Sequence, residues 1–179
     1  MMHWYNEPPV WTANDDTITV QTAPETDFWR ITHSGFIGDN GHFYHQQVTG
    51  DFQVEVKISG QYNSLYDQAG LMVRVDEATW LKTGIEYIDG RQYASAVVTR
   101  EFSDWSVVAL PQAPASLWLR LKRQGITIEI FYSLDGIEYQ LLRQAYLTSL
   151  ESVGVGIMAA SPIGHGFHAT FEGLALKNS

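Results

Sequence analysis

Hydrophobic and polar residues alternate with a period of two along most of this chain. The clearest case is DFQVEVKISG, residues 51–60, in which every second residue from Phe52 to Ile58 is apolar and the residues between them are polar. A period of two is typical of a β-strand with one buried face, because successive side chains point to opposite sides of a sheet. We therefore predict a half-buried strand in this segment.

Many other segments have the composition of strands, and their boundaries are marked by turn residues. Asp–Gly pairs begin at Asp89 and Asp135, a Gln–Gly pair begins at Gln124, and Pro111 and Pro114 bracket a loop. Such punctuation is typical of hairpins between antiparallel strands. The further predicted strands are residues 17–22, 28–32, 41–48, 68–76, 80–88, 93–100, 105–110, 117–122, 126–133, 138–144, 153–160 and 167–176.

So many strands need more than one sheet, and we predict an all-β fold of two antiparallel sheets packed as a jelly-roll sandwich. We expect one such domain to span residues 1–179. The run PPVWTANDDTITV near the N-terminus is predicted to supply an edge strand, because proline cannot donate to a central ladder. The only helical feature expected is a turn at residues 147–151.

Composition and charge exclude several classes of partner. The formal net charge is −9 and the eleven Lys and Arg residues are mostly dispersed, so we expect no nucleic-acid partner. No apolar run approaches the roughly 20 residues of a membrane helix, and we expect no membrane partner. The start MMHWYNEPP lacks the basic and apolar parts of a signal peptide, and with no cysteine in the chain a cytoplasmic protein is expected. A mature chain trimmed of a leader would have the same pattern.

Polar and aromatic side chains converge on one predicted sheet face. Arg74 lies near the end of one strand, and Trp80, Lys82 and Glu86 share a face of the next. A turn near residues 77–79 would set Arg74 beside Lys82. With Arg as a planar fork and Trp as a stacking platform, this face would suit a hydroxylated or anionic ligand. The alternative is an ordinary charge network on a solvated sheet face.

Four further residues are candidates for the same ligand-binding face. Ser95 and Thr99 share one face of the strand that follows, although such an alternation is also ordinary strand composition. Trp105, in the segment SDWS, would stand at the rim, while the adjacent Asp104 fits a turn. His45 could donate a hydrogen bond into the groove or simply pack.

Two segments carry a resemblance to a known family. AGLMVRVDEATWLKTGIEY, followed by SAVVTREFSDWS, resembles the family of the regulation-of-enolase protein, long catalogued as a domain of unknown function. The segments WYNEPPVW and TDFW are similar to it as well, so the resemblance runs from Trp4 to about Leu176. It implies a concanavalin A-like lectin and glucanase jelly roll, a superfamily that typically meets carbohydrate on its concave sheet face. It supplies no catalytic residues.

The pattern favours binding over catalysis. Glycoside hydrolysis needs two carboxylates across one linkage, and the only acidic pair with a spacing of two is Glu25 and Asp27, in an expected loop. Histidines spaced by three, such as His42 and His45, point to opposite faces of a strand. No nucleophile motif, phosphate loop or dinucleotide fingerprint is present. We therefore predict no catalytic residues, no metal site and no cofactor.

The leading functional hypothesis is a non-catalytic jelly roll that binds a carbohydrate or sugar derivative on its concave face. The second is a regulatory protein that contacts a metabolic enzyme as its protein partner. The third, less favoured, is an unrecognised carbohydrate-active enzyme that uses Glu86 as its acid or base.

Overall fold

Two large antiparallel sheets form the body of the protein in a computed structural model, which describes residues 1–178. Sheet A is, in spatial order, β1 (His3–Tyr5), β6 (His42–Thr49), β15 (Ser152–Ala160), β8 (Gln68–Arg74), β9 (Thr79–Ile88), β10 (Arg91–Arg100) and β11 (Phe102–Ala109). Sheet B is β14 (Gln140–Tyr146), β13 (Thr127–Ser133), β12 (Leu117–Gln124), β7 (Phe52–Gly60), β16 (His168–Asn178), β3 (Thr17–Gln21) and β2 (Val10–Asn14). The predicted all-β sandwich is confirmed.

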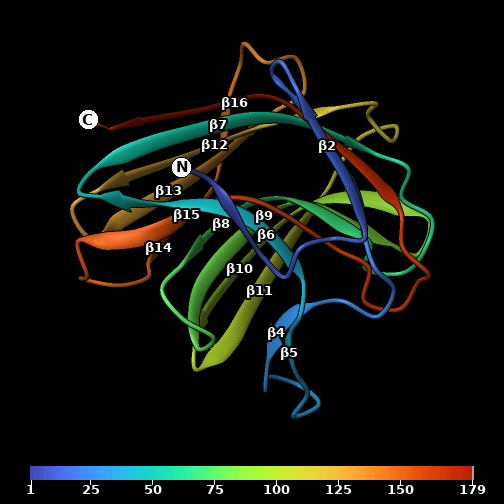
Figure 1. The fold of residues 1–179 in the computed structure, drawn as a ribbon, viewed down its shortest axis with the longest axis horizontal. Coiled ribbons are helices and arrows are strands. Elements are labelled where there is room, and N and C mark those ends of the chain that lie inside the picture. The colour runs from blue at the N-terminus through green and yellow to red at the C-terminus, as the bar shows by residue number, and fades with distance from the viewer. Residues whose placement is uncertain (179) are drawn as a thin grey trace.

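A separate hairpin of β4 (Phe28–Arg30) and β5 (Ile37–Asp39) lies outside the sandwich. In Figure 1 it lies below sheet A, on the side turned away from sheet B. We call this side of sheet A its concave face. Sheet A is therefore covered on both faces, by sheet B on one side and by the hairpin on the other.

The main core fills the space between the two sheets. On β7 the residues Phe52, Val54, Val56 and Ile58 are buried and the residues between them are not, as the alternation predicts. Sheet A contributes residues such as Leu71 from its opposite face, and the two sets form one hydrophobic cluster. Burial of apolar area at roughly 25 cal/mol per Å² is the main force that holds the sheets together.

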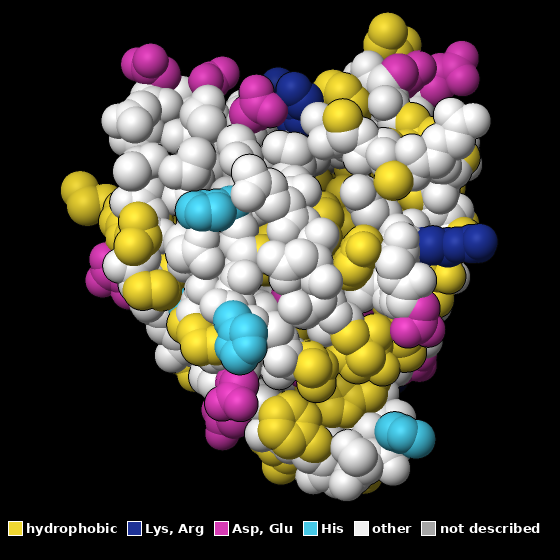
Figure 2. Space-filling view, turned by 90° about the vertical axis from the view of Figure 1, so that its right-hand side faces the viewer, with side chains coloured by type: hydrophobic (Ala, Val, Ile, Leu, Met, Phe, Trp, Pro, Cys, Tyr) yellow, Lys and Arg dark blue, Asp and Glu magenta, His cyan; other side chains and the backbone are white. Residues whose placement is uncertain are grey.

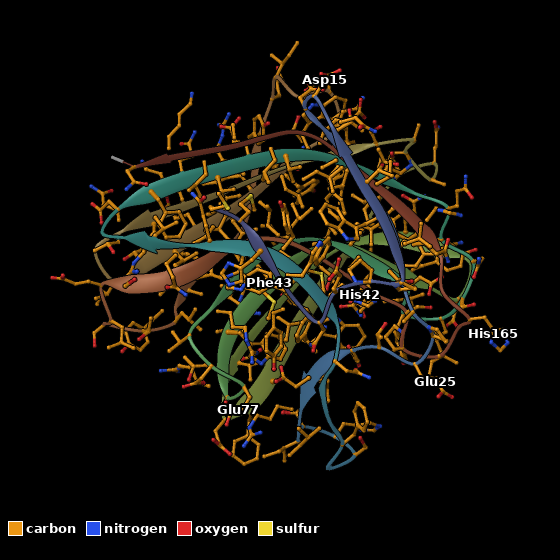
Figure 3. All side chains as sticks on the ribbon, viewed as in Figure 1. Asp15, Glu25, His42, Phe43, Glu77 and His165 are labelled. Atoms are coloured by element: carbon orange, nitrogen blue, oxygen red, sulfur yellow. The ribbon has the colours of Figure 1, made fainter. Side chains whose placement is uncertain are left out.

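A second, smaller core lies between the concave face and the hairpin. Phe28 of β4 packs there with Phe43 of β6, Met72 of β8 and Trp80 of β9. All four side chains are fully buried. Figure 3 shows Phe43 near the centre of the molecule. This cluster fixes the position of the hairpin relative to sheet A.

The strands predicted from the sequence are all present, with ends shifted by a few residues. The predicted edge strand is confirmed as β2, at the margin of sheet B. Two short strands, β1 and β5, were not expected. Residues 147–151 form a loop, so the expected helical turn was wrong. Within residues 1–178 no helix is long and apolar enough to cross a membrane.

Candidate ligand-binding pocket

A large pocket lies on the concave face of sheet A, beside the β4–β5 hairpin. Its volume is about 970 Å³, near the upper end of the usual range for small-molecule sites. Its walls come from β8 to β11, from the loops around the hairpin and from the loop after β15. Glu25 marks one edge, in the loop before β4 (Figure 3). Figure 2 views the molecule from the right-hand side of Figure 1, and in it hydrophobic side chains gather at the lower end, the height at which the hairpin lies in Figure 1.

The carboxyl group of Glu86 is the most buried acid of the pocket. Its Oε2 accepts hydrogen bonds from Ser95 Oγ at 2.7 Å and from Trp105 Nε1 at 2.9 Å. Among residues 1–178 no hydrogen bond reaches Oε1, which leaves that oxygen available to a ligand. The side chain is only 7% exposed, and burial raises the pKa of Glu86 despite the opposing effects of Lys82 and the two donors.

Lys82 ties the sheet to the start of the hairpin. Its Nζ donates to the Phe28 carbonyl at 2.6 Å and lies 3.4 Å from Asp27 Oδ1. The ammonium group also lies 5.5 Å from the centroid of Trp80, within cation–π range. The charge of Lys82 is therefore already offset within the protein.

Three aromatic rings stand at the mouth of the pocket. Trp105 of β11 is perpendicular to Trp29 of β4, at 89° with centroids 6.3 Å apart. It is also nearly perpendicular to Tyr66, at 83° and 6.3 Å. Trp105 is 40% exposed, and the edge of its indole is fixed by the hydrogen bond to Glu86. Such rings offer flat apolar faces beside a polar group.

Two glycines lie opposite each other on the concave face, and one of them lies between Lys82 and Glu86 along β9. Gly70 and Gly84 face each other across β8 and β9. A Cβ on Gly84 would lie 2.0 Å from the Ala69 carbonyl oxygen, and one on Gly70 would lie 1.8 Å from that of Thr83. No side chain fits at either position unless the backbone of the paired strand moves.

The structure places all eight predicted site residues on the concave face, but it brings only some of them to the pocket. Lys82, Glu86 and Trp105 line it, and Ser95 donates a hydrogen bond to the Glu86 carboxyl group. Thr99 is fully buried and shares a hydrogen bond of 2.8 Å with Ser103, which does line the pocket.

Arg74 lies away from the pocket, and the register that the sequence predicted for it was wrong. The sequence placed Arg74 beside Lys82, whereas the register pairs Arg74 with Trp80 and Met72 with Lys82. The turn between β8 and β9 is centred on residue 77, one residue earlier than predicted, and this shift moves each pairing by two residues. The guanidinium of Arg74 is instead held by Asp39, at 2.9 and 3.0 Å.

Trp80 and His45 also pack away from the pocket. Trp80 is 1% exposed in the second core, and its Nε1 donates to the Glu77 carbonyl at 3.3 Å. His45 stacks on Phe43 at 4.4 Å, and its Nδ1 is buried without a hydrogen-bond partner among residues 1–178. Burial, with the nearby charges of His3 and Arg74, lowers the pKa of His45 to about 4.

Several lining residues were not among the predicted site residues. Asp27 and Trp29 lie before and within the hairpin, and Tyr66 and Gln68 lie at the start of β8. The acidic pair that includes Asp27 was assigned to a solvated loop, yet Asp27 reaches the same pocket as Glu86. Trp29 lay in the segment TDFW and in the predicted strand 28–32, but it was not predicted as a site residue.

Comparison with known proteins places this architecture among characterised folds. The family model described as "Protein of unknown function (DUF1349)" matches residues 4–179. The chain is 38% identical over 169 residues to "Regulation of enolase protein 1" of Saccharomyces cerevisiae, covering 94% of this chain and 85% of that protein. A crystal structure of a functionally unknown protein from the same yeast has a TM-score of 0.95 and 36% identity, covering 99% and 96% of the two chains.

Two more distant structures share the fold alone. A mutant of the GH43 protein BlXynB from Bacillus licheniformis has a TM-score of 0.79 and 15% identity, covering 99% of this chain and 37% of the other. The carbohydrate-binding module CBM66 from Bacillus subtilis has a TM-score of 0.63 and 10% identity, covering 98% and 95%. Both similarities agree with the predicted concanavalin A-like sandwich.

Proposed function

The chain belongs to the DUF1349 family of proteins of unknown function, and starting from that membership we propose that its concave-face pocket binds a carbohydrate or sugar derivative without turnover. The observation that carries this proposal is the pairing of aromatic faces with a buried carboxyl group. Trp29 and Trp105 present flat rings. Glu86, whose Oε1 is free, accepts a hydrogen bond from the indole of Trp105 through its other oxygen. A sugar ring offers apolar C–H faces to such rings and hydroxyl donors to such an oxygen.

Two further features support a sugar ligand. The volume of about 970 Å³ accommodates a ligand larger than a single small metabolite. The fold is shared with a carbohydrate-binding module, which raises the expectation of a sugar ligand by analogy, since fold alone does not determine function.

Thermal-shift and calorimetric titration with a panel of neutral, amino and acidic sugars tests this proposal. A sugar that binds only the folded state raises Tm, because it stabilises that state by RT ln(1 + [L]/Kd). We expect this shift to be lost in Trp105→Ala and kept in Trp118→Ala, a control on sheet B beside Lys57. No shift with any sugar, or a shift that survives in Trp105→Ala, would overturn the proposal. Release of new reducing ends from an oligosaccharide would contradict binding without turnover.

A second candidate function is contact with a metabolic enzyme. The name of the yeast relative, "Regulation of enolase protein 1", favours enolase as the partner to test. At the end of the hairpin, Phe36 and Ile37 are about half exposed, which suits an apolar protein contact. Calorimetry with purified enolase should give a complex that Phe36→Ser weakens and Ile126→Ser, a control in the β12–β13 turn, does not. An absence of heat on mixing would rule this candidate out.

A further inference from the structure

The lining of the pocket is acidic. Glu25, Asp27, Glu86 and Asp104 contribute carboxyl groups, whereas Lys82 is the single Lys or Arg residue among the lining residues. The negative charge of an anionic sugar would therefore be repelled by the pocket. This argues against the anionic ligand that the sequence analysis considered. Electrostatic complementarity favours a neutral or positively charged ligand instead.

The existing ion pairs leave Glu86 without a cation. Lys82 Nζ lies 3.4 Å from Asp27, and Arg143 lies 3.2 Å from Asp104 at the rim. Among residues 1–178 no Lys, Arg or His nitrogen lies within 4.0 Å of the Glu86 carboxyl oxygens. The most buried carboxyl group of the pocket thus has an open oxygen and no paired charge.

The aromatic residues form a corner beside this carboxyl group. Because Trp29 and Trp105 are perpendicular with centroids 6.3 Å apart, a cation placed between their faces would lie within about 6 Å of both. Tyr66 adds a ring on Trp105 at 83°. Aromatic faces that enclose a cation are an arrangement that binds organic ammonium groups.

We propose that the ligand of this pocket carries an ammonium group, as an amino sugar does, and that this group lies between Trp29 and Trp105 and donates to Glu86. The inference rests on the proposed function, because it names the class of sugar that the same pocket takes. Asp27 and Asp104 add long-range attraction, while Lys82 excludes the ammonium group from the Asp27 side.

The pH dependence of binding follows from the groups that face Glu86. These are Lys82 on the same strand, Asp27 from the loop before β4, and the donors Ser95 and Trp105 from β10 and β11. Burial raises the pKa of Glu86, and a bound cation favours the ionised form. Affinity for an ammonium ligand should therefore increase as the pH rises through the pKa of Glu86, and binding below that pH should release protons.

Calorimetric titration of the intact protein with D-glucosamine, N-acetyl-D-glucosamine and tetramethylammonium tests the inference. The first two share one skeleton and differ in charge. We expect glucosamine to bind about tenfold more tightly or better, which is the difference that one charge-assisted hydrogen bond supplies. Glu86→Gln should abolish this preference, and Glu172→Gln, on sheet B and paired with Lys57, should keep it.

The outcomes separate the two proposals. Equal binding of glucosamine and its N-acetyl derivative would overturn the ammonium inference and leave carbohydrate binding in place. Binding of tetramethylammonium without any sugar would uphold a cation site between the two rings, would overturn the hydrogen bond to Glu86 because this probe has no N–H, and would overturn the carbohydrate function. Binding of none of the probes would overturn the ammonium inference, and the wider sugar panel would then decide the carbohydrate function. If Glu86→Gln fails to fold, the affinities of the three probes for the wild type still decide whether the ligand carries an ammonium group.

Discussion

Arg74 and Asp39 form a bidentate ion pair that fastens the end of β5 to β8. Nη1 and Nη2 of Arg74 lie 2.9 and 3.0 Å from the two carboxylate oxygens of Asp39. Tyr5 donates to the same carboxylate at 2.7 Å, and its ring lies 4.5 Å from the guanidinium carbon. The hairpin that borders the pocket is therefore held to sheet A by a charged contact as well as by the second core.

Arg74→Met should destabilise the protein by about 3 kcal/mol. This is the lower end of the range for breaking a buried pair, because the Asp39 side chain is 23% exposed. Urea unfolding measures the loss. The double variant Arg74→Met with Asp39→Leu should recover part of it, since no unpaired charge remains. A single variant as stable as the wild type would show that the pair does not hold the hairpin.

Glu86→Gln should raise Tm near pH 8 and leave it unchanged near pH 4. Burial raises the pKa of the Glu86 carboxyl above its usual 4.5, so the folded state holds this proton to higher pH than the unfolded state. The stabilising effect of the neutral form is complete below pH 4.5 and is lost as pH rises through the raised pKa. The amide keeps the acceptor for Ser95 and Trp105 without the buried charge.

Melting curves from pH 4 to pH 9 check this prediction, with Glu172→Gln, a partly exposed position on sheet B, as the control. A Tm difference between Glu86→Gln and the wild type that stays constant across this range would contradict the burial of an ionisable carboxyl group at this position.

His45→Gln should make the protein less sensitive to acid. The pKa of His45 is lowered to about 4 by burial and by the charges of His3 and Arg74, whereas in the unfolded chain it lies near 6.5. The unfolded state therefore binds more protons between these two values, and stability falls as pH drops from 6.5 toward 4. The neutral amide removes this contribution.

Stability of His45→Gln and the wild type, measured by urea unfolding at several pH values in that window, tests the point. His165→Gln, an exposed position, serves as the control. If the wild type and His45→Gln lose stability equally on acidification, His45 is not the group responsible.

Gly84→Ala should cost about 1 to 3 kcal/mol, the usual cost of overpacking a close-packed site. The added Cβ would lie 2.0 Å from the Ala69 carbonyl oxygen, and a paired backbone moves little. Gly38→Ala is the matched control, because its Cβ would meet mainly the side chain of the exposed Phe36, which can turn away. Equal losses in the two variants would show that β8 and β9 are less tightly fixed than their contacts indicate.

The sequence was sufficient to predict which residues share a sheet face. Period-two alternation placed Lys82, Glu86 and Ser95 on the face opposite to Leu81 and Ile85, and this is the arrangement in the structure. Such patterns depend only on the geometry of a strand, so they do not require knowledge of the partners.

The sequence was not sufficient to predict which of these residues meet in one pocket. The position of the β8–β9 turn sets the register, and a shift of that turn by one residue moved the partner of Arg74 from Lys82 to Trp80. Asp27 and Trp29 reach the site only because the hairpin folds under sheet A, a long-range contact with no local signal. The acidic character of the pocket depends on such contacts and emerges only from the fold.

The chain contains six tryptophans, and their indole N–H resonances give the most direct test of binding in the concave-face pocket. Trp29 and Trp105 line the pocket, whereas the other four lie elsewhere in the fold. During an NMR titration with D-glucosamine, assigned through single Trp→Phe variants, we expect the signals of Trp105 and Trp29 to move and those of Trp4, Trp11, Trp80 and Trp118 to stay. Movement confined to the second group, or of no signal at saturating sugar, would contradict a carbohydrate site at this face.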